Sequence, residues 1–455
     1  MNIKYYNSIY NFLFNFIIAS FIFFWGVKFF DFDTRLIILI LLIPIIFSLL
    51  KNITQKKFVF NLIKNNKNFI YFFSFFLIHL TLMSLINNIE IQFYNLKSII
   101  FFTLVGIIYI FNRDRIINNL NKIIFIFLAI FIFVFFISFF MQSDDLVGFC
   151  SQQYVIYISQ KTGLNFYPGN NLLFQENSHL AMVLIGSLFY ILHRGFQNFY
   201  YLLFFIISFV VSIFYLSTTY LAGLILSGFV LSFYFFYKKS LNYKKLIMVI
   251  IGIVSIAFFL MFTDKNCAKK ITDIRFKSLH KKDFFKEPKF EPPAARKFFL
   301  DLNTNLYIEA EIIDGGKTGY YPKNLTSTTY ERSIKINIET IKNNLLGWGY
   351  SNNNIATTIY QNDNSDISRI SQLRFLNMQD ALGNLFKLIN EFGILIIFLF
   401  YKFLFYFFNK EKTQDHKIFF ICIFLVQLFR GAGYVNGGFC FAIIEIIFYQ
   451  KFLKK

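Results

Sequence analysis

Five residues of this 455-residue chain could carry out chemistry at a single site. Glu176 precedes an apolar run and could act as a base toward a hydroxyl group. Four arginines further along the chain could hold an anionic group through paired hydrogen bonds: Arg332, Arg369, Arg374 and Arg430. A transfer reaction in which pyrophosphate leaves needs both functions, a cation for the leaving group and a base for the attacking hydroxyl. These residues therefore indicate group transfer from an anionic donor.

The chain lacks the motifs of several other chemistries. It has no Walker loop, no dinucleotide fingerprint and no His-Glu-x-x-His, so nucleotide-driven transport and zinc proteolysis have no sequence support. None of its four cysteines has metal-ligand spacing, and we expect neither a metal nor a cofactor. Cys150 and Cys267 could form a disulfide if both face an oxidising compartment. Cys422 and Cys440 lie in apolar runs, where we expect them to pack.

Composition places these residues in a membrane protein. The chain is 56% hydrophobic and 22% aromatic, with a mean hydropathy of +0.54, which excludes an ordinary water-soluble fold. Its net charge of +20 comes from short basic clusters between apolar runs. That arrangement is typical of membrane topology, so we expect a lipid bilayer and no nucleic acid as partner.

About twelve apolar runs are long enough to suggest helices that cross the bilayer. They cover residues 12–30, 36–50, 69–86, 98–111, 123–141, 177–193, 200–216, 219–237, 246–262, 384–408, 418–429 and 438–449. The last two could instead form a re-entrant hairpin around the glycines between them. The sequence thus predicts an all-α, polytopic transmembrane bundle. Two ionisable residues inside these runs, His79 and Glu445, are expected to be packing or inner-leaflet residues.

The basic clusters predict the orientation of the bundle. In a twelve-span arrangement, five lysine- and arginine-rich loops or tails fall on one side, which the positive-inside rule makes cytoplasmic. Both termini are then cytoplasmic and the long polar segment lies outside. The predicted units are an N-terminal bundle (1–262), a large periplasmic loop (263–383) and C-terminal transmembrane helices (384–455).

An amphipathic helix is predicted inside the large loop. Ile334, Ile338, Ile341 and Leu345 form a stripe at helical spacing, so we expect this helix to lie on something apolar. Gly347-Trp348-Gly349 should end the helix, and a polar turn over residues 351–354 should follow it.

Four separated patches resemble the O-antigen polymerase and O-antigen ligase superfamily. The patches are residues 174–181, 216–220, 332–349 and 383–393. The resemblance implies that Glu176 and Arg332 are catalytic. It also implies that further residues bind the substrate. Other residues are included because they lie in the same loops and turns. The full predicted set of substrate-binding residues is His179, Tyr220, Gly347, Gly349, Arg369, Arg374, Asn384, Arg430 and Tyr434.

Three departures from the family pattern bear on the activity. Asn177 replaces a proline, and Tyr220 replaces an arginine that ligase-like members carry. Ligases usually present His-Asn where this chain has Gly383-Asn384, so polymerase is the better match. Glu391, in the same patch, is expected to be buried near the outer interface, where a carboxylate needs a partner or a function.

The resemblance implies a metal-independent, inverting polymerase of the bacterial inner membrane. It would join oligosaccharide units carried on polyprenyl pyrophosphate at the periplasmic face, alongside a flippase and a chain-length regulator. One alternative is the ligase of the same superfamily, which transfers glycan to lipid A core. A flippase or secondary transporter is a second alternative, although the chain shows no internal repeat.

Overall fold

The computed structural model of the protein describes most of the apolar sequence and part of the polar loop. The described residues are 3–24, 28–29, 32–33, 43, 67–141, 177–213, 215, 217–238, 244, 246–256, 307–312, 317–322, 325–363, 383–409, 415–431, 433–434 and 438–453.

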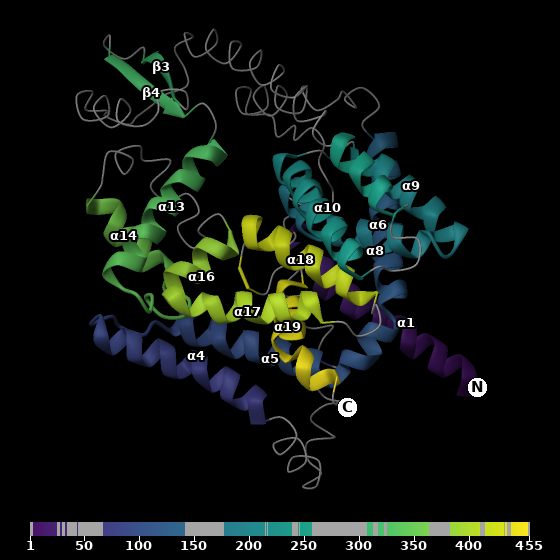
Figure 1. The fold of residues 1–455 in the computed structure, drawn as a ribbon, viewed down its shortest axis with the longest axis horizontal. Helices are drawn as coiled ribbons and strands as arrows, with labels where there is room; N and C mark the ends of the chain where they lie inside the picture. The colour runs from purple at the N-terminus through teal and green to yellow at the C-terminus, as the bar shows by residue number, and fades with distance from the viewer. Residues whose placement is uncertain are drawn as a thin grey trace.

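Helices make up almost all of the described structure (Figure 1). They are α1 (Ile3–Phe24), α4 (Lys67–Ile86), α5 (Phe93–Asn118), α6 (Leu120–Met141), α8 (Asn177–Gly195), α9 (Phe199–Ile213), α10 (Thr218–Lys238), α13 (Leu325–Asn343), α14 (Asn353–Asp363), α16 (Asn384–Phe392), α17 (Ile396–Phe408), α18 (His416–Arg430) and α19 (Phe439–Leu453). The 3-10 turn η3 (Gly393–Leu395) joins α16 to α17, and residues 246–256 are also helical. Two short antiparallel hairpins pair β1 (Lys28–Phe29) with β2 (Phe32–Asp33) and β3 (Tyr307–Ile312) with β4 (Lys317–Pro322).

Five helical segments of the described chain are long and apolar enough to cross a membrane. They are Phe69–Ile86, Phe93–Asn118, Leu120–Ile137, Thr219–Lys238 and Asn384–Phe408. Apolar segments form helices because each backbone group must be bonded within its own segment when no water is present. The predicted all-α fold, with several helices apolar enough to cross a membrane, is therefore confirmed, whereas the count of about twelve spans stays a prediction.

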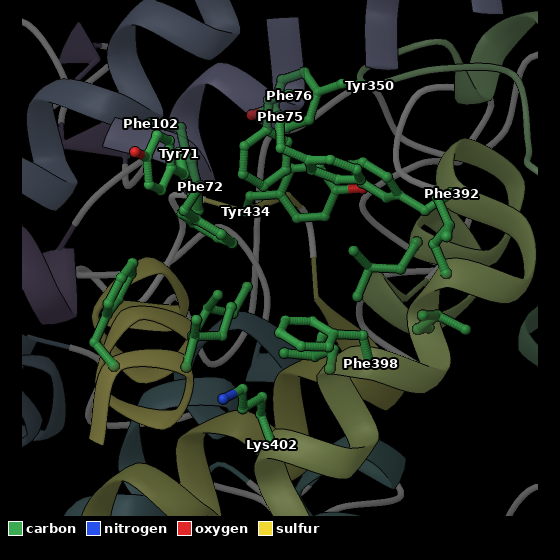
Figure 2. Close-up of a pocket in the computed structure, with 17 residues that line it drawn as sticks. Tyr71, Phe72, Phe75, Phe76, Phe102, Tyr350, Phe392, Phe398, Lys402 and Tyr434 are labelled. Atoms are coloured by element: carbon green, nitrogen blue, oxygen red, sulfur yellow. The ribbon is translucent and has the colours of Figure 1, made fainter. Parts of the chain in front are cut away.

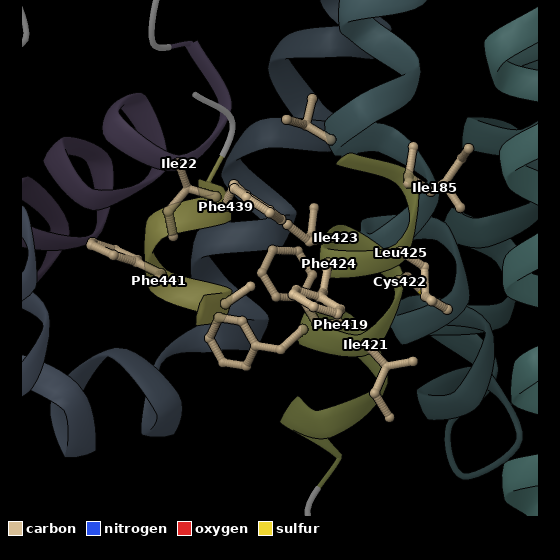
Figure 3. Close-up of a cluster of buried hydrophobic side chains, with 14 of the residues drawn as sticks. Ile22, Ile185, Phe419, Ile421, Cys422, Ile423, Phe424, Leu425, Phe439 and Phe441 are labelled. Atoms are coloured by element: carbon tan, nitrogen blue, oxygen red, sulfur yellow. The ribbon is translucent and has the colours of Figure 1, made fainter. Parts of the chain in front are cut away.

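Helix α18 is the centre of the bundle. Every residue from His416 to Leu428 is buried, and the helix packs against α8, α10, α16 and α19. Figure 3 shows its side chains beside Ile185 of α8 and Phe439 of α19, with Ile22 of α1 next to Phe439. With 15 residues, α18 is about 22 Å long, less than the roughly 30 Å of a hydrocarbon core. We infer that its helical neighbours shield it from lipid.

The helices run between two chemically different ends of the bundle. The turn end is defined by Gly347, Asn384 and Tyr434, and the ion-pair end by Arg113, Asp415 and Glu445. Helix α5 starts at the turn end, where Asn95 donates to Asn352, and reaches the ion-pair end at Arg113. Helix α18 runs the opposite way, from His416 to Arg430.

Both termini lie toward the ion-pair end. Asn11, in the first half of α1, accepts a hydrogen bond from Arg115 just beyond Arg113, whereas Ile22 meets Gly438 at the other end. Helix α19 starts at Gly438 and passes Glu445 toward the C-terminus. In Figure 1 the labelled N and C ends lie away from α13 and α14. This common side agrees with the predicted topology, and the compartment that it faces stays a prediction.

The helices of the large loop, α13 and α14, are folded close to the turn end. Helix α13 starts at Leu325, earlier than Ile334 where the predicted apolar stripe begins, and ends at Asn343 just before the Gly347-Trp348-Gly349 turn. Helix α14 begins at Asn353, within the stretch predicted to be a polar turn. The β3–β4 hairpin precedes α13 and has no counterpart in the sequence predictions.

Candidate functional site

Helix α13 docks on α16 through its polar face. Ser333, Asn337 and Thr340 are buried, and Asn337 donates from Nδ2 to the carbonyl of Phe386 at 3.0 Å. The apolar stripe, which was predicted to lie on something apolar, faces away from the protein, with Ile338 47% exposed. The other stripe residues are exposed as well: Ile334, Ile341 and Leu345. Hydrogen bonds and the buried Ile336, which packs with Trp348 and Tyr360, therefore hold this helix, and the apolar stripe faces away from the protein.

Asn390 of α16 is the centre of the hydrogen-bond network beneath α13. Its Oδ1 accepts from Nδ2 of Asn337 and, at 3.0 Å, from Oγ1 of Thr340, and its Nδ2 donates to Oδ1 of Asn353 at 2.8 Å. One amide thus joins α13, α14 and α16. Because the side chains are neutral, the network orders the loop without placing charge in the site.

The Gly347-Trp348-Gly349 turn is docked backbone to backbone on the end of α16. The N–H groups of Trp348 and Gly349 donate to the carbonyls of Asn390 and Glu391, each at 2.9 Å. Gly347 has φ of 79°, and a Cβ there would lie 2.5 Å from the carbonyl oxygen of Glu391. Only glycine combines that φ with so close an approach. Gly347 and Gly349 thus have a packing role in the structure, and their contact with substrate stays a prediction.

Glu391 lies fully buried under this turn. Its Oε2 accepts a 2.6 Å hydrogen bond from the hydroxyl of Tyr434, and Lys387 contributes a nearby positive charge. The backbone N–H groups of Ser351 and Asn353, where α14 begins, also face the carboxylate. The N-terminus of a helix favours an anion, so Glu391 ties the start of α14 to the turn that contains Tyr434. The predicted buried carboxylate thus has several partners.

Tyr434 is kept as a hydrogen-bond donor by its surroundings. Burial and the negative charge of Glu391 raise the pKa of Tyr434 well above that of an ordinary tyrosine. Its ring stands 5.4 Å from that of Tyr350, which follows the glycine turn. Tyr434 therefore connects the turn between α18 and α19 to the described part of the large loop.

Gly383 and Asn384 fit tightly against the C-terminal end of α18. A Cβ at Gly383 would lie 2.6 Å from the carbonyl oxygen of Phe429, so no side chain fits at this position as it is packed. Asn384 is fully buried, and its Oδ1 accepts from the N–H of Gly433 at 3.1 Å. Gly383, at the position where ligases usually have histidine, is thus closely surrounded by backbone atoms of α18.

Arg430 and the segment that carries Arg332 lie on contacting elements. Tyr330 of α13 donates from its hydroxyl to the carbonyl of Phe429 at 2.5 Å. Burial raises the pKa of Tyr330, and the positive charge of Arg430 counteracts this effect, as expected for neighbours. Arg332 follows two residues later in the same helix, but its side chain is outside the described residues.

The remaining predicted site residues lie in different parts of the structure, and some are outside the described residues. His179 lies half-buried in the first turn of α8. Tyr220 of α10 is buried, with its hydroxyl 2.6 Å from that of Ser212 on α9. Several predictions fall outside the described residues: Glu176, Arg369, Arg374, Cys150 and Cys267. Cys422 and Cys440 are free and buried, which confirms their packing role.

A cavity of about 650 Å³ opens beside the turn end, between α4, α17 and α19 (Figure 2). Tyr350 and Tyr434 line one end, and Lys402 lines the other. Its wall is otherwise apolar: Tyr71, Phe72, Phe75, Phe76, Phe102, Leu388, Phe392, Leu395, Ile396, Phe398, Leu399, Ile443, Ile447 and Phe448. This volume lies within the range of about 300–1,000 Å³ that is typical of small-molecule sites.

The sequence did not reveal the contacts of two residues in this region. Asn390 lies in the patch 383–393 but was given no role, because asparagine is abundant throughout the chain. His79 was expected to pack or to lie in the inner leaflet. It does pack, 5.0 Å from the ring of Phe392, but at the turn end, where its Nε2 lies 3.0 Å from the carbonyl oxygen of Leu346. The helical spacing of residues 67–86 could not show which end of the helix meets the loop.

Comparisons with protein-family models, with curated proteins and with solved structures found no match. The described residues contain no group of three or more His, Cys, Asp or Glu side chains that could hold a metal ion.

Proposed function

We propose that the protein is a multi-pass bacterial inner-membrane polymerase that joins oligosaccharide repeat units carried on polyprenyl pyrophosphate. The proposal includes about twelve spans, cytoplasmic termini and a periplasmic segment over residues 263–383. The glycan pathway would supply the donor through a flippase and set polymer length through a regulator. The family resemblance supplies this reaction, and the geometry of the turn end supports a site for it.

The observation that carries the proposal is the convergence of distant patches at the turn end. The turn at Gly347, the start of α16 at Asn384 and the turn at Tyr434 come from three parts of the sequence. They are joined by backbone and side-chain hydrogen bonds through Glu391 and Gly433. Residues selected by motif, Gly347 and Asn384, therefore lie together with Tyr434, which was selected by location, beside a cavity able to take an apolar ligand.

The exposed stripe of α13 supports placing this site at the membrane surface. Asn344, just after α13, donates to Asn87, next to the exposed Leu85 and Ile86 at the end of α4. Because α4 is apolar enough to cross a membrane, the stripe continues a lipid-facing surface. An amphipathic helix of this kind lies at the boundary between headgroups and acyl chains. Arg332 would then be level with the pyrophosphate of a lipid-linked substrate.

In the proposed reaction, a hydroxyl of the acceptor glycan attacks the anomeric carbon of the donor. Glu176 accepts the proton of that hydroxyl as the new glycosidic bond forms. The bond from the anomeric carbon to the pyrophosphate oxygen breaks, and the oxygen keeps the electron pair. Arg332 and Arg430 stabilise the charge that develops there, because guanidinium groups bind phosphate oxygens in pairs. Attack from the opposite face inverts the anomeric centre.

The packing at Gly383 favours polymerase over ligase. A histidine there would have to displace the carbonyl groups at the end of α18. The arrangement seen here therefore does not accommodate the residue that the ligase pattern places before Asn384. This agrees with the absence of histidine from this patch of the sequence.

Deleting the gene and analysing lipopolysaccharide on gels would test the proposal. We expect the deletion strain to carry single repeat units, because initiation and transfer to lipid A core still occur. Accumulation of long lipid-linked polymer would identify a ligase instead, and unchanged lipopolysaccharide would reject both activities.

Arg332→Ala should fail to restore polymer length in that strain while its membrane level stays normal. Lys335→Ala is the matched control, because Lys335 is a cation one turn further along α13 and is exposed. We expect this variant to restore full-length polymer. Full-length polymer with Arg332→Ala would remove Arg332 from the site.

A further inference from the structure

Glu391 is the point at which two separate segments of the turn end are bonded to one carboxylate. Its Oε2 accepts the 2.6 Å hydrogen bond from Tyr434, which lies in the turn after α18. The N–H groups of Ser351 and Asn353, where the large loop enters α14, face the same carboxylate. Glu391 itself is fully buried on α16. One side chain therefore joins the large loop, α16 and the turn after α18.

The backbone at Ser351 is bent where it meets Glu391. Its φ of 66° lies in the left-handed region, which is unfavourable for a residue that has a Cβ. In this conformation its N–H group faces Glu391, and its carbonyl accepts a hydrogen bond from the hydroxyl of Tyr94 on α5. A residue keeps such a backbone only where its surroundings hold it there. The contact with Glu391 is therefore one of those that fix the loop.

The segments that Glu391 joins lead to the two arginines of the proposed anion site. Arg430 ends α18, and Tyr434 follows it by four residues. Arg332 lies on α13, which is hydrogen-bonded to α16 and α14 through Asn390, the residue next to Glu391. Cations that bind one ligand must be held at a fixed separation. A contact that fixes both segments should therefore also affect how well an anion binds.

We propose that Glu391 is a positioning residue that sets how the loop and the turn after Arg430 lie relative to each other, an inference that rests on the proposed function. Because its side chain is fully buried, Glu391 acts through Tyr434 and through the N–H groups of the loop.

The sign of the effect on anion binding separates positioning from simple electrostatics. A carboxylate close to an anion site weakens anion binding by charge alone, since like charges repel. On that basis, removing the charge of Glu391 would tighten anion binding. Positioning predicts the opposite, because the two segments are held together less firmly once the carboxylate is lost.

Glu391→Gln is the variant that distinguishes these effects. Glutamine keeps the shape of the side chain and an oxygen for Tyr434, but it removes the negative charge that faces Lys387 and the N–H groups of the loop. The assay uses the full-length protein in lipid nanodiscs, with lipid-linked repeat units extracted from the deletion strain as substrate. Inorganic pyrophosphate is the competing anion. Amide hydrogen exchange of peptides that contain Ser351 and Asn353 measures the contact itself.

We expect Glu391→Gln to raise the inhibition constant of inorganic pyrophosphate by about tenfold, which corresponds to about 1.4 kcal/mol of binding free energy. Exchange in the Ser351 and Asn353 peptides should become faster. Glu339→Gln is the matched control, because it removes a carboxylate that pairs with Lys342 on the surface of α13, and it should leave both measurements close to wild type. A folded Glu391→Gln that binds pyrophosphate as tightly as wild type, or more tightly, would overturn the proposal.

Tyr434→Phe keeps the test decisive if Glu391→Gln does not fold. It removes the same hydrogen bond from the other partner, so it should raise the inhibition constant in the same direction. The double variant should be about as impaired as the more impaired single variant, because both changes act on one contact. Additive effects of the two substitutions would show that Glu391 does not act through Tyr434 and would overturn the proposal.

The outcome is separable from that of the polymerase proposal. Faster exchange in Glu391→Gln, in a protein whose deletion leaves lipopolysaccharide unchanged, would reject the polymerase but retain Glu391 as the residue that positions the loop. Unchanged exchange and unchanged pyrophosphate inhibition in Glu391→Gln, together with loss of polymer in Arg332→Ala, would reject the positioning role alone.

Discussion

The two ends of the bundle stabilise their buried polar groups with different kinds of interaction. At the ion-pair end, Glu445 is fully buried and accepts two 2.7 Å hydrogen bonds from Arg113, with Tyr109 and His416 also beside it. At the turn end, neutral amides and backbone groups supply most of the contacts, centred on Asn390. The first arrangement pairs a buried carboxylate with a guanidinium group, whereas the second surrounds one buried carboxylate, Glu391, mainly with neutral groups.

This difference indicates that one end anchors the helices and the other end suits ligand binding. A buried ion pair with satisfied partners has one well-defined geometry and has no charge left for a ligand. Amide networks hold a loop in place through several neutral hydrogen bonds rather than one ion pair. The ion-pair end therefore anchors the bundle, and the turn end is where we propose that the anionic substrate binds.

Removing one partner of the buried ion pair should have the largest effect on the fold. Glu445→Gln leaves Arg113 charged and buried without its carboxylate, which costs about 3–5 kcal/mol. We expect a strongly reduced Tm in detergent and a low folded yield. Glu339→Gln is the matched control, because Glu339 pairs with Lys342 on the surface of α13, and it should change Tm little. Equal losses in the two variants would contradict the anchoring role.

At the turn end we expect a smaller and more local loss. Asn390→Ala leaves buried partners on α13 and α14 without their hydrogen bonds, at a cost of about 1–3 kcal/mol. Limited proteolysis should then cut within residues 325–363 faster, while the Tm of the bundle falls little. Asn343→Ala, an exposed control on α13, should be cut at the wild-type rate. A large fall in Tm without faster cleavage would show that the two ends are not independent.

The sequence predicted the helical membrane bundle because apolar runs must form helices in lipid. It also predicted α13 and the glycine turn, because spacing and turn residues are local signals. It did not predict what the polar face of α13 contacts, since Asn337 and Thr340 find partners on α16, a segment distant in the sequence. The contacts of Asn390 and His79 depend on the same long-range packing, which periodicity does not encode.

Glycine substitutions compare the turn end with a neutral position in the bundle. Gly347→Ala forces a side chain into a φ of 79° and against the backbone of Glu391, which should destabilise the turn by about 1–2 kcal/mol. Gly252→Ala is the matched control in a helix, because a Cβ there meets no atom within 4 Å. It should leave stability unchanged or raise it by about 1 kcal/mol. Differential scanning fluorimetry of both variants checks this contrast.

The smallest effect should come from the partly exposed contact at the ion-pair end. Oδ1 of Asp415 lies 3.1 Å from Nε2 of His193, and Oδ2 lies 3.0 Å from Nη2 of Arg194. Burial alone would raise the pKa of Asp415, but these neighbours outweigh it and hold the pKa below the usual value of about 3.8. A carboxylate whose pKa is depressed on folding stabilises the fold above its unfolded pKa and loses that contribution as pH falls through the folded value.

Asp415→Asn should therefore lower Tm slightly at pH 7, and the difference from wild type should shrink below pH about 4, where the wild-type carboxylate takes up its proton. Thermal melts across that range measure the two curves. Glu445→Gln should keep its larger deficit over most of the same range, because Arg113 remains buried and charged. If the Tm values of both variants approached the wild-type Tm over the same pH range, the groups of the ion-pair end would titrate together. The ion-pair end would then not anchor the bundle at acid pH.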